Sequence, residues 1–127
     1  ERIKTQVNIA EILGVKLMRH DATFSFPNND SSFAGFLNVV DVLAYGCKKI
    51  TEYAEFKGIK TMIENHGLFC QDSDRIELLI KTVAHKNFGA LVDIGNFLCA
   101  DEDPHLAVSK CAAYALNVHV KDFIFKS

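Results

Sequence analysis

Three residues that could bind a metal ion or transfer protons each stand beside a short apolar run. Glu64 follows the letters TMI, Asp93 follows ALV, and His119 lies between two valines. Each is separated from the next by roughly 30 residues, about the length of one strand and one helix. The three residues could therefore occupy equivalent places in a repeated strand–helix unit.

Two carboxylates and one imidazole form a mixed set of hard and borderline ligands, which suits a divalent ion such as Mn²⁺, Co²⁺, Zn²⁺ or Mg²⁺. Each residue also has an ordinary explanation. Glu64 could pair with a lysine, and Asp93 could form an Asx turn. His119 could be a hydrogen-bonded core histidine. A shared site is favoured because it explains all three positions with one geometry.

Apolar residues at helical spacing predict four helices, each followed by a short apolar strand. The expected helices cover residues 3–13, 36–54, 73–83 and 104–115. The expected strands cover residues 15–18, 59–63, 90–92 and 118–120. Gly14 and Gly58 are expected to end the first two helices. Ser73 is the expected N-cap of the third, and Asp103 before Pro104 indicates the start of the fourth.

Short apolar strands that alternate with helices are typical of an α/β fold built from parallel βα units. In such folds the carboxyl ends of the strands share one edge of the sheet, and ligands bind there. We therefore expect Glu64, Asp93 and His119 to converge at that edge.

The composition excludes several classes of protein. The chain has 127 residues, 49% of them hydrophobic and 24% charged, with a formal net charge of −2 and a pI near 6.2. No basic tract favours nucleic acid as a partner, and no apolar run is long enough to span a membrane. The four cysteines are scattered, so we expect small buried side chains in a reducing, cytoplasmic compartment rather than disulfides or a zinc knuckle.

Four segments together resemble the sugar phosphate isomerase/epimerase family, whose members are xylose isomerase-like TIM barrels. The segments read IAEILGVKLMRHD, GIKTMIENHG, GALVDIGNF and NVHVKDF, in that order. The resemblance covers nearly the whole chain. It implies that residues 1–127 form one partial domain, about half of a (β/α)₈ barrel, with N-terminal and C-terminal strands missing.

The resemblance also implies roles for individual residues. Glu64 would be a metal ligand and a catalytic acid/base group, with Asp93 and His119 as further ligands. Residues near the substrate would be His66, Asn96, Lys121 and Arg19. The implied activity is metal-dependent isomerisation or epimerisation of a small carbohydrate or its phosphate, by proton transfer through an enediolate.

The chain departs from this family in length, since a full barrel needs roughly 250 residues. The family's second acid/base glutamate lies on the final strand and has no counterpart here. We therefore expect a fragment of a larger enzyme, or a half-barrel that assembles with something else, and little activity from these residues alone. Open sheet edges would favour self-association.

Other functions stay open on the sequence. A lyase or dehydratase of the same barrel family, acting on an inosose or on dehydroshikimate, would use the same ligands. An endonuclease IV-like phosphodiesterase would be expected to have more histidines and a basic groove. A non-catalytic binding domain would be expected to lose metal affinity, and a flavodoxin-like domain would need a phosphate loop after its first strand. Phe24 and Phe26 could cover a sugar face or simply pack in the core.

Overall fold

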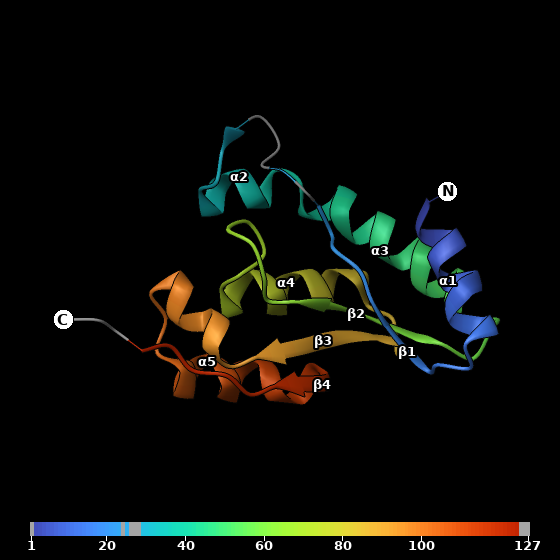
Figure 1. The fold of residues 1–127 in the computed structure, drawn as a ribbon. Helices are drawn as coiled ribbons and strands as arrows, with labels where there is room; N and C mark the ends of the chain where they lie inside the picture. Colours follow the sequence, from blue (N-terminus) through green and yellow to red (C-terminus); the bar gives the residue numbers. More distant parts are fainter. Residues whose placement is uncertain (1, 24, 26–28, 125–127) are drawn as a thin grey trace.

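The structure is a computed structural model that describes residues 2–23, 25 and 29–124, and it alternates helices with short strands (Figure 1). Phe24 and Phe26 lie outside the described residues. The elements in chain order are α1 (Arg2–Ile12), β1 (Leu17–Arg19), α2 (Phe33–Leu37), α3 (Val40–Glu55), β2 (Lys60–Glu64), α4 (Ser73–Val83), β3 (Phe88–Asp93), the 3₁₀ helix η2 (Gly95–Ala100), α5 (Pro104–Cys111), the 3₁₀ helix η3 (Ala112–Tyr114) and β4 (Ala115–His119).

The four strands form one parallel sheet in the order β1-β2-β3-β4, so sequential strands are also neighbours. Leu17 pairs with Lys60, and Thr61 pairs with Phe88. Between β3 and β4 the register shifts after Ala90. This arrangement confirms the α/β fold with parallel βα units that the sequence predicts.

Two apolar clusters hold the helices against the sheet. The larger joins α3, α4 and α5 to β2 and β3, with Leu79 and Val83 fully buried in it. The smaller packs α1 against α3, with Val7 and Ala54 fully buried. A buried polar contact joins α3 to β2: the Thr61 hydroxyl is 2.6 Å from that of Thr51 on α3. Satisfied buried hydroxyls of this kind fix the position of a helix on a strand.

The helix predicted over residues 36–54 is wrong as a single element. The structure has two helices, α2 and α3, joined by a tight turn at Asn38 and Val39. The Val39 amide donates to the Phe36 carbonyl, a three-residue step rather than a four-residue one. Phe36 and Val40 are both buried across this turn. Apolar spacing continues through such a turn, which is why it suggests one uninterrupted helix.

The helix ends agree with the sequence in part. Gly14 and Gly58 follow α1 and α3 with φ of 71° and 67°, as expected for helix stops. Asp103 caps α5 by accepting from the His105 amide, which confirms that start. The cap of α4 is Asp72, not Ser73, because the Asp72 carboxylate reaches the Arg75 amide. The fourth helix is also shorter than expected: α5 ends at Cys111, and residue 115 already begins β4.

The cysteines are all free, and three of the four are buried as expected, whereas Cys99 is exposed. Burial raises the pKa of the Cys47, Cys70 and Cys111 thiols to about 12. No helix within the described residues has the length and apolar character needed to cross a membrane.

Candidate metal centre

The candidate ligands point to the face of the sheet that is opposite the helices, because side chains alternate in direction along a strand. Ile63 and Val92 belong to the apolar cluster beneath α3, α4 and α5. Since successive strand residues point to opposite faces, the next residues, Glu64 and Asp93, face the other side of the sheet. His119 is the direct pairing partner of Asp93 across β3 and β4.

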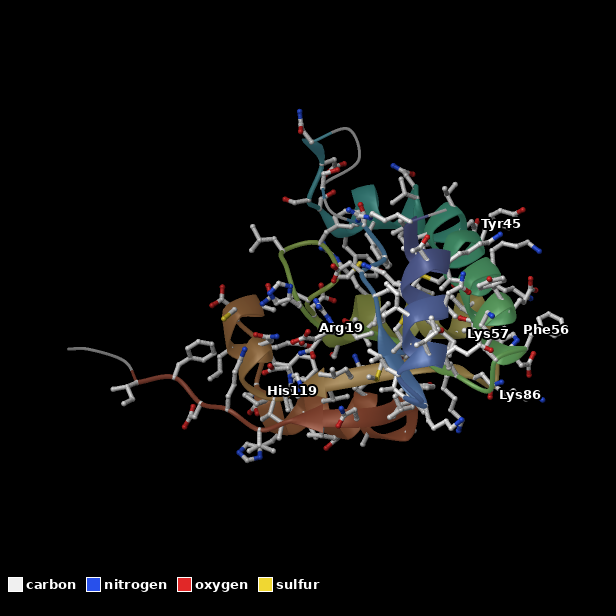
Figure 2. All side chains as sticks on the ribbon, turned by 45° about the vertical axis from the view of Figure 1, so that its right-hand side comes forward. Arg19, Tyr45, Phe56, Lys57, Lys86 and His119 are labelled. Atoms are coloured by element: carbon white, nitrogen blue, oxygen red, sulfur yellow. The ribbon has the colours of Figure 1, made fainter. Side chains whose placement is uncertain are left out.

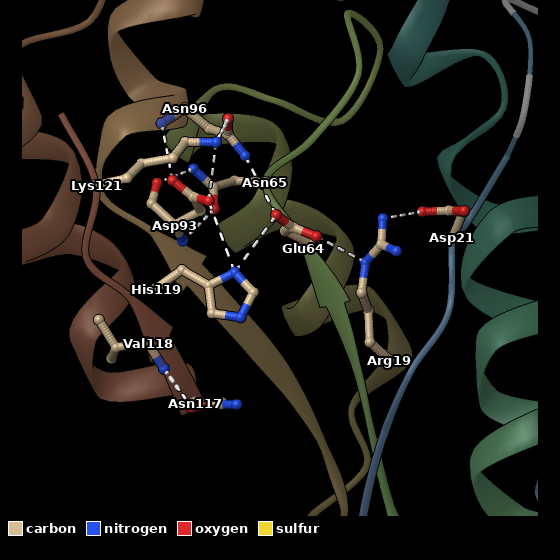
Figure 3. A network of polar contacts seen from close by, with 10 residues as sticks. All are labelled: Arg19, Asp21, Glu64, Asn65, Asp93, Asn96, Asn117, Val118, His119 and Lys121. Carbon is tan, nitrogen blue, oxygen red and sulfur yellow. Dashed lines mark hydrogen bonds and ion pairs between the residues drawn. The ribbon is translucent and has the colours of Figure 1, made fainter. Parts of the chain in front are cut away.

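The expected convergence of the three residues is present (Figure 3). One potential ligand atom from each of Glu64, Asp93 and His119 lies within 4.8 Å of the others. His119 Nδ1 is 3.7 Å from Asp93 Oδ2 and 3.9 Å from Glu64 Oε1. The Asp93 and Glu64 side chains are only 3% and 11% exposed, whereas His119 is 52% exposed. The cluster therefore has a buried acidic floor and an accessible imidazole.

Lys121 and Asn96 complete the cluster on the side of Asp93. The Lys121 ammonium lies 3.1 Å from Asp93 Oδ2 and donates to Asn96 Oδ1 at 2.7 Å. The Asn96 amide nitrogen in turn reaches Glu64 Oε1 at 3.3 Å, and its backbone N–H donates to Asp93 Oδ1. Lys121 and Asn96, two of the four residues predicted to lie near the substrate, are thus joined to the two carboxylates.

Arg19, at the end of β1, holds the opposite side of Glu64. Its Nε lies 2.8 Å from Glu64 Oε2, and its Nη2 lies 2.8 Å from Asp21 Oδ1. Figure 2 shows Arg19 and His119 at one end of the sheet, with Phe56 and Lys86 far away at the other end. The ends of all four strands thus contribute to one network, as the parallel topology requires.

Asn65 is a member of this network that the sequence did not single out. It is 1% exposed, and its carboxamide makes two hydrogen bonds to the backbone of Asp93. Position alone could have indicated it, because Asn65 directly follows the last residue of β2. Nothing in its residue type distinguishes it from an ordinary turn asparagine.

His66 is not brought into the cluster. It is exposed in the loop after β2, where its backbone pairs with Cys70. Among the described residues, no hydrogen bond or ion pair joins its side chain to Glu64 or Asp93. Asp122, close to Lys121 in the chain, accepts a hydrogen bond from the Phe123 amide.

Buried polar contacts hold the loops around the cluster. Gln71, in the loop after β2, donates to the Asn96 carbonyl. Glu102, after η2, accepts from the Ser73 amide and hydroxyl at the start of α4. His20 follows Arg19 but packs against Phe88 instead of joining the cluster. Burial lowers the pKa of His20, so its ring stays neutral at physiological pH.

The donor set fits a divalent cation. Atoms that share one ion at bond lengths of about 2.0–2.6 Å lie no more than about 5 Å apart. The ligand atoms of Glu64, Asp93 and His119 meet this limit without any change of strand position. Neighbouring groups supply the outer hydrogen bonds that metal ligands need, since Arg19 and Asn96 hold the two oxygens of Glu64.

The whole sequence matches a known protein family. The model of the xylose isomerase-like TIM barrel family matches residues 1–127. The chain belongs to the xylose isomerase-like TIM barrel family. Its four parallel strands and alternating helices form about half of such a barrel. No curated protein sequence matches the chain significantly.

Solved structures with the same fold include three xylose isomerase-like or related proteins. A xylose isomerase domain protein from Planctomyces limnophilus is 20% identical with a TM-score of 0.70 and aligns over 93% of this chain. A probable 3-DHS dehydratase, AsbF, involved in petrobactin synthesis in Bacillus anthracis, is 14% identical with a TM-score of 0.73 over 93% of this chain. A xylose isomerase-like TIM barrel protein from Mycobacterium smegmatis, in complex with magnesium, is 17% identical with a TM-score of 0.74 over 94%.

The chain spans 40%, 42% and 43% of the lengths of these three structures. At identities of 20% or less, the likeness establishes the shared fold of this xylose isomerase-like half-barrel. Residue roles must therefore be argued from the cluster itself.

Proposed function

We propose that this chain carries the metal centre of an isomerase or epimerase acting on a small sugar or sugar phosphate. The observation that supports this most is the meeting of Glu64, Asp93 and His119 from three successive strand ends. Membership of a barrel family that contains isomerases, epimerases and dehydratases agrees with it. The activity itself is proposed for the whole protein, because the chain spans only part of its structural neighbours.

The proposed reaction moves a proton from a carbon next to a carbonyl, through an enediolate, to the neighbouring carbon or to the opposite face. A divalent ion held by Glu64, Asp93 and His119 would supply Lewis-acid stabilisation of the charge that develops on the substrate oxygens. The charged groups around the cluster are suited to this task, since two carboxylates face one guanidinium and one ammonium.

Glu64 is the proposed acid/base carboxylate as well as a ligand. Arg19 holds its Oε2 at 2.8 Å, which fixes the carboxylate plane and leaves Oε1 directed toward His119 and Asn96. A carboxylate oriented in this way can take up or return a proton at a fixed position.

Lys121 and Asn96 are the proposed substrate contacts on the far side of Asp93. The half-exposed Lys121 ammonium can reach a substrate oxygen while remaining close to Asp93. A cation at that place would stabilise negative charge on the substrate. His66 remains a proposed contact from the exposed loop after β2. A dehydratase would use the same ligands, and a substrate panel on the full-length protein distinguishes the two reactions.

Mn²⁺ binding tests the proposal. Isothermal titration of the wild-type chain should give one site, and Glu64→Gln should weaken it at least tenfold, because one charged ligand oxygen is lost. Glu77→Gln is the matched control, since Glu77 lies on α4 and pairs with Lys81 and Tyr114. Unchanged affinity in Glu64→Gln, or no Mn²⁺ binding by the wild type, would contradict the proposed metal centre.

A further inference from the structure

Asn65 ties the end of β2 to the end of β3 through its side chain. Its Nδ2 donates to the Asp93 carbonyl at 2.9 Å, and its Oδ1 accepts from the Asp93 amide at 2.7 Å. Figure 3 shows the carboxamide turned toward Asp93, while the neighbouring Glu64 side chain points to His119 and Arg19. At 1% exposure, the carboxamide is shielded from competition by water.

These two hydrogen bonds replace backbone pairing that the fold cannot provide. Glu64, opposite Leu91, is the last residue of β2 in the β2–β3 register, and the chain then turns into the loop that carries His66. Asp93 lies two residues beyond Leu91 on β3, so no residue of β2 is left to pair with its backbone. A carboxamide carries a donor and an acceptor at one end, so it can satisfy both the N–H and the C=O of one residue. Aspartate lacks the donor, and leucine lacks both.

We infer that Asn65 is a positioning residue for the metal centre, setting the distance between the Glu64 and Asp93 ligand atoms. Glu64 is covalently adjacent to Asn65, and the hydrogen bonds to Asn65 are made by the backbone of Asp93 itself. We call these two hydrogen bonds the Asn65 clamp. Because Asn65 is bonded covalently to Glu64 and by hydrogen bonds to the backbone of Asp93, the clamp links the two carboxylate residues directly. This inference rests on the proposed metal centre, because it concerns the separation of two of its ligands.

The test uses two substitutions at this position. Asn65→Asp keeps the shape but sets a carboxylate against the Asp93 carbonyl, and Asn65→Leu removes both hydrogen bonds. Each should weaken Mn²⁺ binding by about 10- to 100-fold, the usual effect of losing a partner that orients metal ligands. Neither substitution removes a ligand atom. Asn65→Leu also leaves the charge unchanged, so its effect on affinity acts through position, whereas the negative charge added by Asn65→Asp attracts the cation and opposes the loss.

Thr61→Val is the matched control. It removes a buried hydrogen bond from the same strand, but that bond faces Thr51 on α3 and not the cluster. It should lower the melting temperature and leave Mn²⁺ affinity within twofold of wild type. Amide hydrogen exchange gives an independent readout without metal. Relative to the other amides of β3, the Asp93 N–H should exchange faster in Asn65→Leu, whereas Thr61→Val should speed exchange of the β3 amides uniformly.

The outcomes separate the two ideas. Weakened Mn²⁺ binding in the Asn65 variants, with normal binding in Thr61→Val, supports the positioning role. Wild-type affinity in a folded Asn65 variant overturns it while the metal centre stands. Absence of Mn²⁺ binding by the wild type overturns both. If both variants fail to fold, Asn65→Ser is tested in the same way, because its short side chain cannot bond to both the N–H and the C=O of Asp93; wild-type Mn²⁺ affinity in that variant overturns the inference.

Discussion

Replacing Arg75 by Met tests how the loops around the proposed metal centre are held in place. The Arg75 side chain is 9% exposed, and its guanidinium donates to the carbonyls of Ser31 and Phe69 at 2.8 and 3.0 Å. A longer contact reaches the Leu68 carbonyl at 3.4 Å. One arginine on α4 thus connects the loop after β1 with the loop after β2.

The expected cost follows from these contacts. The buried Phe69 carbonyl costs about 1–3 kcal/mol without its donor, and loss of the partly buried contact to the Ser31 carbonyl and of the 3.1 Å ion pair with Asp72 adds to this cost. Methionine keeps an unbranched apolar stem of similar reach against Phe36 and Phe69, whose rings lie 5.7 and 5.6 Å from the guanidinium carbon. It also removes the cost of burying a charge. We therefore expect Arg75→Met to lower the free energy of unfolding by about 2–4 kcal/mol, a large share of the total for a domain of this size.

Urea unfolding followed by circular dichroism measures this loss. Lys81→Met is the control on the same helix, because Lys81 makes an exposed ion pair with Glu77 and should leave the midpoint nearly unchanged. Hydrogen exchange should quicken in both loops of Arg75→Met, near Ser31 and Phe69. A midpoint as high as that of Lys81→Met would mean that the two carbonyls need no donor from Arg75, contrary to this prediction.

Three further predictions concern burial and packing. At pH 8 the exposed Cys99 should react quickly with a thiol reagent, and the three thiols whose pKa burial raises to about 12 should react only on unfolding: Cys47, Cys70 and Cys111. Because burial lowers the pKa of His20, this side chain takes up a proton below about pH 6.5 in the unfolded chain but stays neutral in the folded chain until the pH is lower. The contribution of neutral His20 to the free energy of unfolding is therefore complete above about pH 6.5 and decreases below it. Between pH 7.5 and 5.5 the free energy of unfolding should fall less in His20→Gln than in the wild type; an equal fall would contradict this. Gly89→Ala should lower the melting temperature, since its Cβ would lie 2.6 Å from the Tyr114 carbonyl oxygen and 2.7 Å from Leu116 Cγ; an unchanged value would mean that η3 and β4 can shift to make room.

The sequence predicted those features that depend on periodicity and strand order. Alternating apolar segments were sufficient to indicate parallel βα units, and parallel strands bring their carboxyl ends to one edge whatever the loops do. The meeting of Glu64, Asp93 and His119 follows from that topology alone. Their roles in binding metal and substrate stay predictions until binding is measured.

The parts that were missed depend on local three-dimensional detail. The break between α2 and α3 preserves the burial of Phe36 and Val40, so apolar spacing does not reveal it. The choice of Asp72 over Ser73 as the cap of α4 depends on which oxygen reaches the Arg75 amide. The clamp by Asn65 depends on a side chain bonding to the backbone of a strand 28 residues away, which no local pattern encodes.

An anomalous difference map from crystals of the chain grown with Mn²⁺ would show whether Glu64, Asp93 and His119 bind one metal ion. We predict one strong peak within coordination distance of Glu64, Asp93 and His119, at the carboxyl edge of β2, β3 and β4. The peak should disappear in Asp93→Asn crystals grown in the same way. A peak elsewhere, or none at this edge, would contradict the assignment of the three strand ends as a metal centre.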